Sequence, residues 1–176
     1  RNDPAGRLPV TFYTGVSQLP KFEDYSMAGR TYRYFDGQPL WPFGYGLSYT
    51  TFRYGHLTLP AGPIAAGAPL TASVSVTNTG KAAGDEVAEL YLKFPDVPGA
   101  PLRALRGFRR IRLEPGASRV VTFQLGSRDL SMVTQAGDRI VAQGTYEVSV
   151  GGGQPGTGAP SVSGTFRVNG QIELPE

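Results

Sequence analysis

Polar and apolar residues alternate strictly in two segments of the second part of the chain. In residues 70–77 every second position is apolar, and the positions between are Ser or Thr. Residues 121–125 repeat the alternation as Val-Thr-Phe-Gln-Leu. A period of two places one set of side chains on a buried sheet face and the other in solvent. Both segments are therefore predicted to be β-strands.

More strand-forming segments occur at short intervals between residues 51 and 171. They are predicted at 52–59, 86–93, 105–113, 139–143, 146–150 and 162–168. Within 86–93, Ala88, Leu90 and Leu92 are expected on one face. Seven or eight short strands with turn formers between them are typical of an antiparallel β-sandwich. The predicted fold class is therefore all-β.

Residues 1–50, here called the arm, show no such period. We expect a short strand at 7–13, a long loop at 14–29 and an extended segment at 31–35. Residues 41–49 are rich in aromatic residues and glycine. A segment this aromatic with so few alternating positions is not expected to fold alone.

Composition narrows the possible chemistry. The chain has 176 residues, with 24 glycines, 15 prolines, 40% hydrophobic and 18% charged residues, which is typical of a globular domain rich in turns. No stretch approaches about 18 consecutive apolar residues, so neither a transmembrane helix nor a membrane partner is expected. The absence of cysteine and the single histidine, His56, exclude disulfides, thiolate ligands and His-rich metal sites. We expect no metal and no cofactor.

The start of the chain and its charge add two expectations. A first residue Arg1 in place of Met indicates a processed product or a fragment of a longer protein. A periplasmic or extracellular location is favoured over the cytoplasm, although the lack of cysteine fits both. The net charge of +3 is small, and it does not demand a nucleic-acid partner.

The densest basic run consists of Arg103, Arg106, Arg109, Arg110 and Arg112. It permits two interpretations, a phosphate-binding stripe or the solvated edge of a strand. No nucleic-acid-binding motif accompanies the run, so the strand edge is favoured and no nucleic-acid partner is expected.

Several segments match a known family in order and spacing. In the arm they are Gly6-Arg7-Leu8-Pro9-Val10-Thr11-Phe12, Gly29-Arg30-Thr31-Tyr32-Arg33-Tyr34-Phe35 and Pro42-Phe43-Gly44-Tyr45-Gly46-Leu47-Ser48-Tyr49-Thr50-Thr51-Phe52. In the strand-rich part they are Val76-Thr77-Asn78-Thr79-Gly80, Gly84-Asp85-Glu86-Val87, Leu105-Arg106-Gly107-Phe108, Leu113-Glu114-Pro115-Gly116 and Gly144-Thr145-Tyr146-Glu147-Val148. Together they resemble the C-terminal portion of glycoside hydrolase family 3, which contains β-glucosidases and β-xylosidases.

The resemblance implies an architecture of a TIM-like barrel, an α/β sandwich domain and a fibronectin type III-like domain. Residues 1–50 would be the C-terminal remnant of the α/β sandwich domain with its linker. Residues 51–176 would be the fibronectin type III-like, immunoglobulin-like β-sandwich. The family's nucleophile lies in the barrel and its acid/base upstream of this chain, and no residue here matches either motif.

The implied role is therefore structural. The chain would complete a retaining glycosidase that hydrolyses terminal β-linked glucose or xylose, and would itself hold no catalytic residue. Its partners would be the remaining catalytic domains. The alternative is a non-catalytic β-sandwich module that binds carbohydrate or protein.

Acidic residues are the remaining candidates for chemistry, because a retaining glycosidase needs two carboxyl groups about 5–5.5 Å apart. Glu23 and Asp24 are adjacent, so on an extended chain they point to opposite sides, and a structural or substrate-loop role is favoured. Asp85, Glu86 and Glu89 are expected to be solvated charges at a turn and a strand start.

One aromatic group in the arm also permits two interpretations. With its neighbouring arginine it comprises Tyr32, Arg33, Tyr34, Phe35, Trp41, Phe43, Tyr45 and Tyr49. The rings could stack on sugars as a carbohydrate platform. They could instead dock the sandwich onto a neighbouring domain, which is favoured because buried aromatic rings contribute large contact areas and Arg33 can pair with carboxylates or carbonyls.

Overall fold

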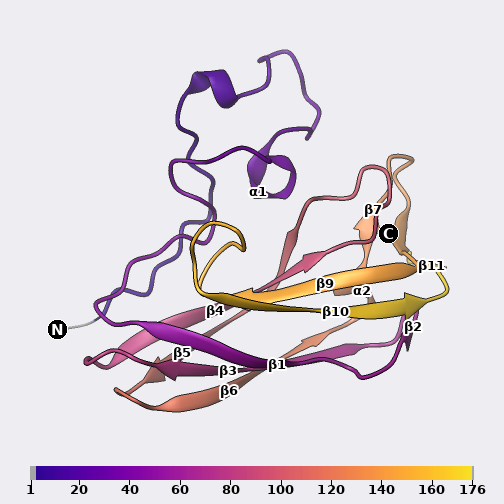
Figure 1. Ribbon diagram of the computed structural model, residues 1–176. Coiled ribbons are helices and arrows are strands. Elements are labelled where there is room, and N and C mark those ends of the chain that lie inside the picture. The colour runs from indigo at the N-terminus through magenta and orange to yellow at the C-terminus, as the bar shows by residue number, and fades with distance from the viewer. Residues whose placement is uncertain (1–2, 176) are drawn as a thin grey trace.

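The computed structural model describes residues 3–175 and shows the arm standing above a layered β-structure (Figure 1). The helical segments are η1 (Val16–Gln18), α1 (Thr31–Tyr34) and α2 (Ser127–Leu130). The strands are β1 (Phe52–Thr58), β2 (Ile64–Ala65), β3 (Leu70–Asn78), β4 (Gly84–Lys93), β5 (Ala104–Leu113), β6 (Ser118–Leu125), β7 (Met132–Val133), β8 (Arg139–Val141), β9 (Gly144–Gly151), β10 (Ser161–Asn169) and β11 (Ile172–Glu173).

Two sheets pack face to face to form the sandwich. One has the strand order β1-β3-β6, and the other has the order β2-β10-β9-β4-β5. A third, small sheet has the order β11-β8-β7. The pairing is antiparallel throughout except between β10 and β2. The predicted all-β antiparallel sandwich is confirmed.

The alternating segments of the sequence build the core. β3 and β6 pair in a register that places Leu70 opposite Leu125 and Val74 opposite Val121, so the apolar sides of both strands share one face. All four side chains are buried. Burial of a side chain of this size contributes about 1.5–3 kcal/mol, which makes the interior between the two sheets the main source of stability.

Two predictions for the arm are wrong. Residues 31–35 are not extended, because α1 forms a single turn in which the Phe35 amide donates to the Thr31 carbonyl at 3.0 Å. The turn places Tyr32 and Phe35 on one side, where Tyr32 stacks on Phe43 and Phe35 packs on Tyr13. These tertiary contacts override the local β-propensity.

The predicted strand at 7–13 is reduced to a single bridge between Phe12 and Trp41. Pro9 and Pro42 lie in the two paired segments, and neither has an amide proton with which to extend the ladder. The pairing therefore consists of a few separate hydrogen bonds.

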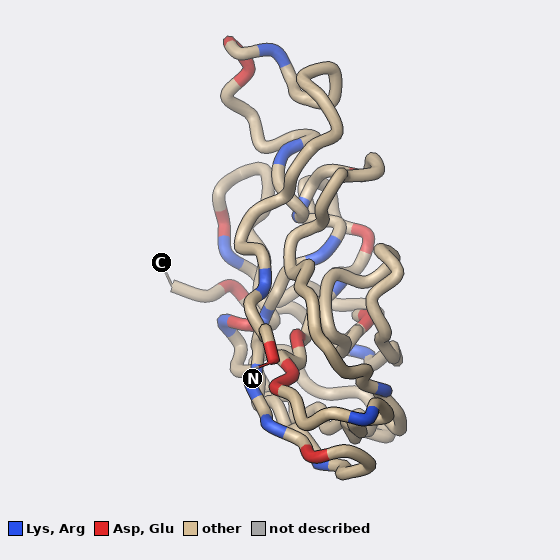
Figure 2. The backbone as a smooth tube through the Cα atoms, turned by 90° about the vertical axis from the view of Figure 1, so that its left-hand side faces the viewer, with Lys and Arg blue, Asp and Glu red and all other residues tan. Residues whose placement is uncertain are grey.

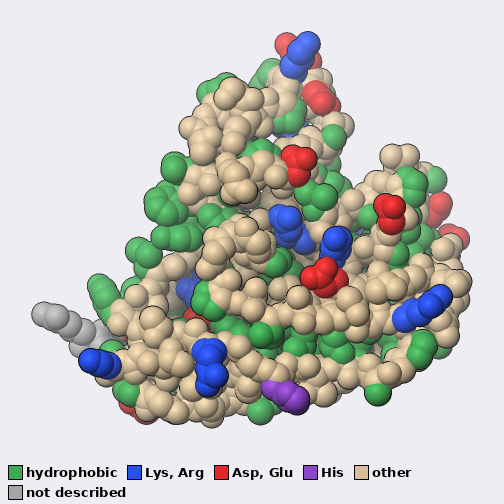
Figure 3. Space-filling view, viewed as in Figure 1, with side chains coloured by type: hydrophobic (Ala, Val, Ile, Leu, Met, Phe, Trp, Pro, Cys, Tyr) green, Lys and Arg blue, Asp and Glu red, His purple; other side chains and the backbone are tan. Residues whose placement is uncertain are grey.

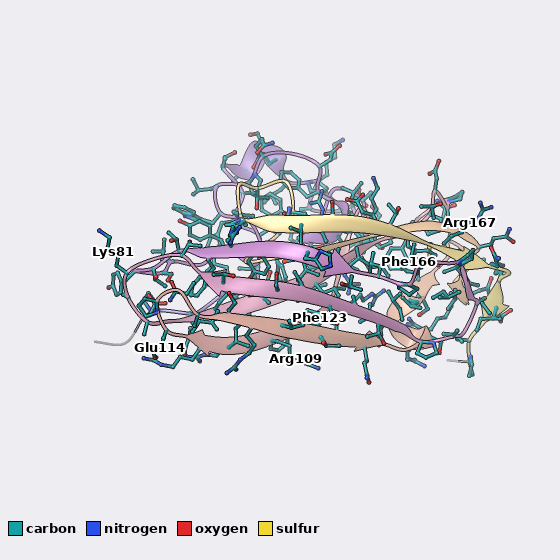
Figure 4. All side chains as sticks on the ribbon, turned by 60° about the horizontal axis from the view of Figure 1, so that its bottom comes forward. Lys81, Arg109, Glu114, Phe123, Phe166 and Arg167 are labelled. Atoms are coloured by element: carbon teal, nitrogen blue, oxygen red, sulfur yellow. The ribbon has the colours of Figure 1, made fainter. Side chains whose placement is uncertain are left out.

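Four of the five arginines of the basic run lie on β5, an edge strand of its sheet, and Arg103 directly precedes it. Arg109, Arg110 and Arg112 are exposed as predicted, whereas Arg103 and Arg106 are half-buried. The Arg110 guanidinium pairs with Asp85 at 2.5 Å, and the Arg109 guanidinium lies 5.9 Å from the centre of the Phe123 ring (Figure 4). Charged side chains on an edge strand also discourage pairing with a second sheet.

Candidate functional site at the junction of arm and sandwich

The arm is closed at its base by backbone hydrogen bonds between its two ends. The Leu8 amide donates to the Tyr45 carbonyl at 2.9 Å, and the Gly44 amide donates to the Leu8 carbonyl at 2.8 Å. The Phe12 amide donates to the Trp41 carbonyl at 2.9 Å. Residues 13–40 therefore form one large loop whose two ends are joined before the chain enters the sandwich.

A cluster of three aromatic rings fixes this base onto the five-stranded sheet. The Tyr32 and Phe43 rings stack with their centres 4.1 Å apart, and both meet the buried Tyr91 ring of β4 edge-on. The Tyr32 hydroxyl also accepts a hydrogen bond from the Leu105 amide at 3.1 Å. Because Leu105 is the second residue of the edge strand β5, this contact satisfies a backbone donor at the sheet border.

Two buried carboxylates lie beneath the arm. Glu86 and Glu89 of β4 are both 3% exposed, so the prediction that they are solvated is wrong. Glu86 forms an ion pair with Arg7 of the arm at 2.7 Å and accepts a hydrogen bond from the Tyr54 hydroxyl at 2.6 Å. Glu89 accepts a hydrogen bond from the Tyr91 hydroxyl at 2.6 Å. Glu86 is in phase with the core-facing residues of β4, whereas Glu89 lies on the opposite face of the strand, which Gly44 of the arm covers.

Burial dominates the electrostatics of both acids. It raises the pKa of the Glu86 carboxyl above its ordinary value, although Tyr54 and Arg7 act in the opposite direction. Burial likewise raises the pKa of Glu89, against the hydrogen bond from Tyr91. The pKa values of both tyrosines are also raised, mainly by burial and then by the neighbouring carboxylates, so each phenol remains a hydrogen-bond donor.

Gly44 is required for this close approach. Its backbone has a φ of +77°, a conformation that side-chain-bearing residues rarely adopt. A Cβ atom there would overlap Glu89 Oε2 and lie 2.7 Å from the Tyr91 hydroxyl. The arm can therefore lie against Glu89 and Tyr91 only with glycine at this position.

Beside this contact an open cleft of about 370 Å³ separates the arm from the β9–β10 loop. Its walls include Arg7, Ser48, Glu86, Gln154 and Thr157. Glu86 is the only carboxylate among the lining residues, and it is already bonded to Arg7 and Tyr54. A retaining glycosidase needs two carboxyl groups on opposite sides of the sugar, and this cleft presents one.

The other candidate docking residues differ in their exposure. Phe35 is buried against Tyr13, and Tyr34 is half-buried. The Arg33 side chain is exposed, while its carbonyl accepts a hydrogen bond from the Leu102 amide at 2.7 Å.

Trp41 and Tyr45 pack against each other, and two of the candidate rings face solvent. The Trp41 and Tyr45 ring centres are 4.6 Å apart. Trp41 is 43% exposed and Tyr49 is 77% exposed. The aromatic group thus contributes partly to the contact with this chain's own sandwich and partly to the outer surface.

Glu23 and Asp24 lie on the arm loop that projects away from the sandwich, and charged positions gather at its tip (Figure 2). Both residues are exposed. Hydrogen bonds from Ser26 to its carboxylate lower the pKa of Asp24. The structure does not bring this pair together with Glu86 and Glu89, which are buried at the other end of the arm.

One feature of the sequence could have predicted the burial of Glu86. Glu86 is in phase with Ala88, Leu90 and Leu92, which face the core, so a charged residue occupied a predicted interior position. The role of Arg7 had no local signal, because its partner is 79 positions away in the sequence.

Metal-binding clusters and membrane-spanning helices are both absent from residues 3–175. No group of three or more potential ligands is placed to hold a metal ion within that range. None of the helices there has the length and apolar character needed to cross a membrane.

Several known proteins are similar to this chain in sequence. Residues 86–154 match the fibronectin type III-like domain family. The chain is 41% identical to a β-xylosidase of Formosa agariphila over 94% of its own length and 37% identical to a periplasmic β-glucosidase of Salmonella typhimurium over 85%. It spans only 24% and 21% of those two proteins.

Solved structures give the same result for the three-dimensional fold. β-Glucosidase 3B of Thermotoga neapolitana superposes with a TM-score of 0.85 at 33% identity, covering 98% of this chain and 26% of that one. The match therefore includes the arm as well as the sandwich. The chain contains a fibronectin type III-like domain and corresponds to the C-terminal portion of glycoside hydrolase family 3 enzymes.

Proposed function

We propose that this chain is the structural, non-catalytic C-terminal part of a retaining β-glycosidase that hydrolyses terminal β-linked glucose or xylose. In this proposal residues 1–50 complete the α/β sandwich domain and link it to the sandwich of residues 51–176. The remaining catalytic domains are the partner, and the exposed side of the arm is the surface they cover.

The distribution of exposed apolar side chains carries the proposal. Of the 15 large hydrophobic residues exposed over the described chain, 11 lie between Val10 and Tyr49. Phe22 and Tyr25 are 89% and 88% exposed. Hydrophobic side chains gather visibly along the arm (Figure 3). Contiguous exposed apolar surface of this kind marks an interaction site.

The arm also lacks an interior of its own. Among described residues 3–50, Phe35 is the only hydrophobic side chain that is buried. A domain has its own hydrophobic core, so this segment belongs to a unit that other residues complete.

A segment exchange tests the proposal. The matching part of the Formosa agariphila β-xylosidase is replaced by this chain, and hydrolysis of an aryl β-xyloside is measured. We expect activity from the hybrid, and loss of activity when Phe22 and Tyr25 are both changed to Ser. The same double change should leave the melting temperature of the isolated 176-residue chain unaltered, because both rings are in solvent.

A matched control separates docking from general surface effects. Phe108→Ser removes an exposed ring from β5 of the sandwich and should leave the hybrid active. Turnover by the isolated chain, or an active hybrid that tolerates the Phe22/Tyr25 change, contradicts the proposal.

One observation favours a second candidate, a carbohydrate-binding surface. Trp41 and Tyr49 present exposed rings on the arm, and aromatic faces can stack on sugars. Affinity electrophoresis of the chain in gels containing soluble xylan or cellulose derivatives tests this candidate. Retardation that is lost in Trp41→Ala supports binding, and equal mobility with and without polysaccharide excludes it.

A further inference from the structure

A pocket of about 180 Å³ lies where the arm, β5 and the β7–β8 hairpin meet. Three of its lining residues are arginines from three different elements. Arg33 comes from α1, Arg106 from β5 and Arg139 from β8. The pocket is separate from the cleft beside Glu86, because the two share no lining residue.

Two of the guanidinium groups are held in place by one buried serine. Arg106 Nη2 donates to the Ser131 carbonyl at 2.7 Å, and Arg139 Nη1 donates to Ser131 Oγ at 3.2 Å. Ser131 is fully buried. The Arg106 guanidinium also lies 5.3 Å from the centre of the Phe94 ring. These contacts fix the orientation of both groups toward the pocket without the help of an acid.

The positive charge of the cluster is not neutralised within the described chain. Over residues 3–175, no carboxylate oxygen lies within 4.0 Å of a guanidinium nitrogen of Arg33, Arg106 or Arg139. Arg106 Nε is buried with no hydrogen-bond partner in that range. Each guanidinium has five donors, so most donors in the pocket are available to a ligand.

The like charges of these groups act on one another, most clearly at Arg106. Burial lowers the pKa of Arg106, and the neighbouring charges of Arg33 and Arg139 lower it further. Asp129 opposes this effect, but its Oδ2 atom accepts the Gly126 amide at 2.8 Å. Clustered like charges destabilise a fold unless a counter-charge binds.

We propose that the Arg33–Arg106–Arg139 pocket binds an oxyanion, either a carboxylate or a phosphate group. Arginine recognises both groups through paired, charge-assisted hydrogen bonds. The volume admits one small anionic group. The anion has two possible sources, free inorganic phosphate or the side-chain carboxylate of an acidic residue outside the described chain. This inference rests on the pocket alone and does not depend on the proposed glycosidase role.

The test is titration of the 176-residue chain with sodium phosphate and, separately, with sodium acetate at constant ionic strength. Binding is followed through the arginine Nε–Hε signals in NMR spectra. We expect saturable binding with a dissociation constant below about 10 mM for at least one anion. Arg33→Gln and Arg139→Gln should each weaken it about tenfold, because each removes a charge-assisted contact.

Arg119→Gln is the matched control, since Arg119 is an exposed arginine on β6 outside the pocket. It should leave binding unchanged, and melting curves check that all three variants remain folded. Preference for phosphate identifies the free anion as the source, and equal or tighter binding of acetate identifies a carboxylate side chain. Absence of saturable binding by both anions, or equal weakening in Arg119→Gln, overturns the proposal.

Discussion

The Tyr54 hydroxyl donates a 2.6 Å hydrogen bond to the Glu86 carboxylate and thereby joins the two sheets of the sandwich. Tyr54 lies on β1 of the three-stranded sheet and Glu86 on β4 of the five-stranded sheet. Arg7 then connects the same carboxylate to the arm. One buried acid therefore links three parts of the molecule, and its partners are the first residues to test.

Removal of Arg7 should destabilise the chain strongly. Arg7→Ala leaves Glu86 buried without its cation, and loss of one partner of a buried pair costs about 3–5 kcal/mol. We expect a decrease of about 3 kcal/mol in the free energy of unfolding, measured by urea denaturation. The additional change Glu86→Gln should recover part of this loss, because it removes the unpaired charge.

Arg110→Ala provides the control for this pair. Arg110 also bonds to a carboxylate of β4, but its side chain is 65% exposed. Exposed pairs contribute about 0–1 kcal/mol, so the unfolding midpoint should hardly move. Equal effects of the two substitutions would contradict the importance assigned to burial.

The stability of the chain should decrease as pH rises through the raised pKa of Glu89. The folded state holds a proton on this carboxyl at pH values where the unfolded chain has released it. The folded state therefore binds more protons in that window, and the free energy of unfolding falls with increasing pH above the ordinary value of 4.5. The contribution is fully present below 4.5 and is lost once the folded carboxyl ionises.

Glu89→Gln isolates this contribution. The amide oxygen can still accept from Tyr91, but it cannot titrate. Urea midpoints between pH 4 and 8 should fall less steeply for the variant than for the wild type. Parallel curves for the two proteins would show that Glu89 titrates alike in the folded and unfolded states.

Gly44→Ala should detach the arm from β4. The new methyl group would overlap Glu89 Oε2, and the backbone would be held at an unfavourable positive φ. Together these effects should cost about 2–3 kcal/mol, measured by thermal or urea unfolding. Gly62→Ala is the control, since open space surrounds that position, and it should be neutral.

Tyr32→Ala should loosen the arm and leave the sandwich core intact. It removes the ring stacked on Phe43 and the acceptor of the Leu105 amide. A loss of about 1.4 kcal/mol in arm attachment corresponds to roughly tenfold more opening, so trypsin should cut after Lys21 and Arg30 about tenfold faster. Tyr49→Ala, which removes a ring in solvent, should leave the cleavage rate unchanged.

Local sequence patterns predicted the sandwich well because most of its strands have one buried face. β3 and β6 alternate cleanly, so their core residues were readable from period alone. β4 was harder, since its outer face is covered by the arm. Glu89 and Tyr91 are buried there by residues far away in the sequence, and no local pattern reports such coverage.

The arm was predicted poorly for the same physical reason. Its conformation depends on contacts between distant residues, such as Tyr32 with Phe43 and Arg7 with Glu86. The turn of α1 forms in a stretch of β-favouring residues, with Thr31 at a φ of +54°. Propensity is a weak guide where tertiary contacts set the backbone.

The hydrogen bonds that join Leu8 to Tyr45 and Phe12 to Trp41 have an evolutionary consequence. Because these bonds join the start of the 13–40 segment to its end, the residues between form a loop that is closed above the strands of the sandwich. Residues 14–29 of this span lie outside the contacts that Tyr32 makes with the sandwich, so their length and chemistry can change while the strands below keep their register, since lengthening a closed loop costs little. The sandwich can therefore stay constant while natural selection remodels a segment that, in the proposed function, the remaining catalytic domains cover.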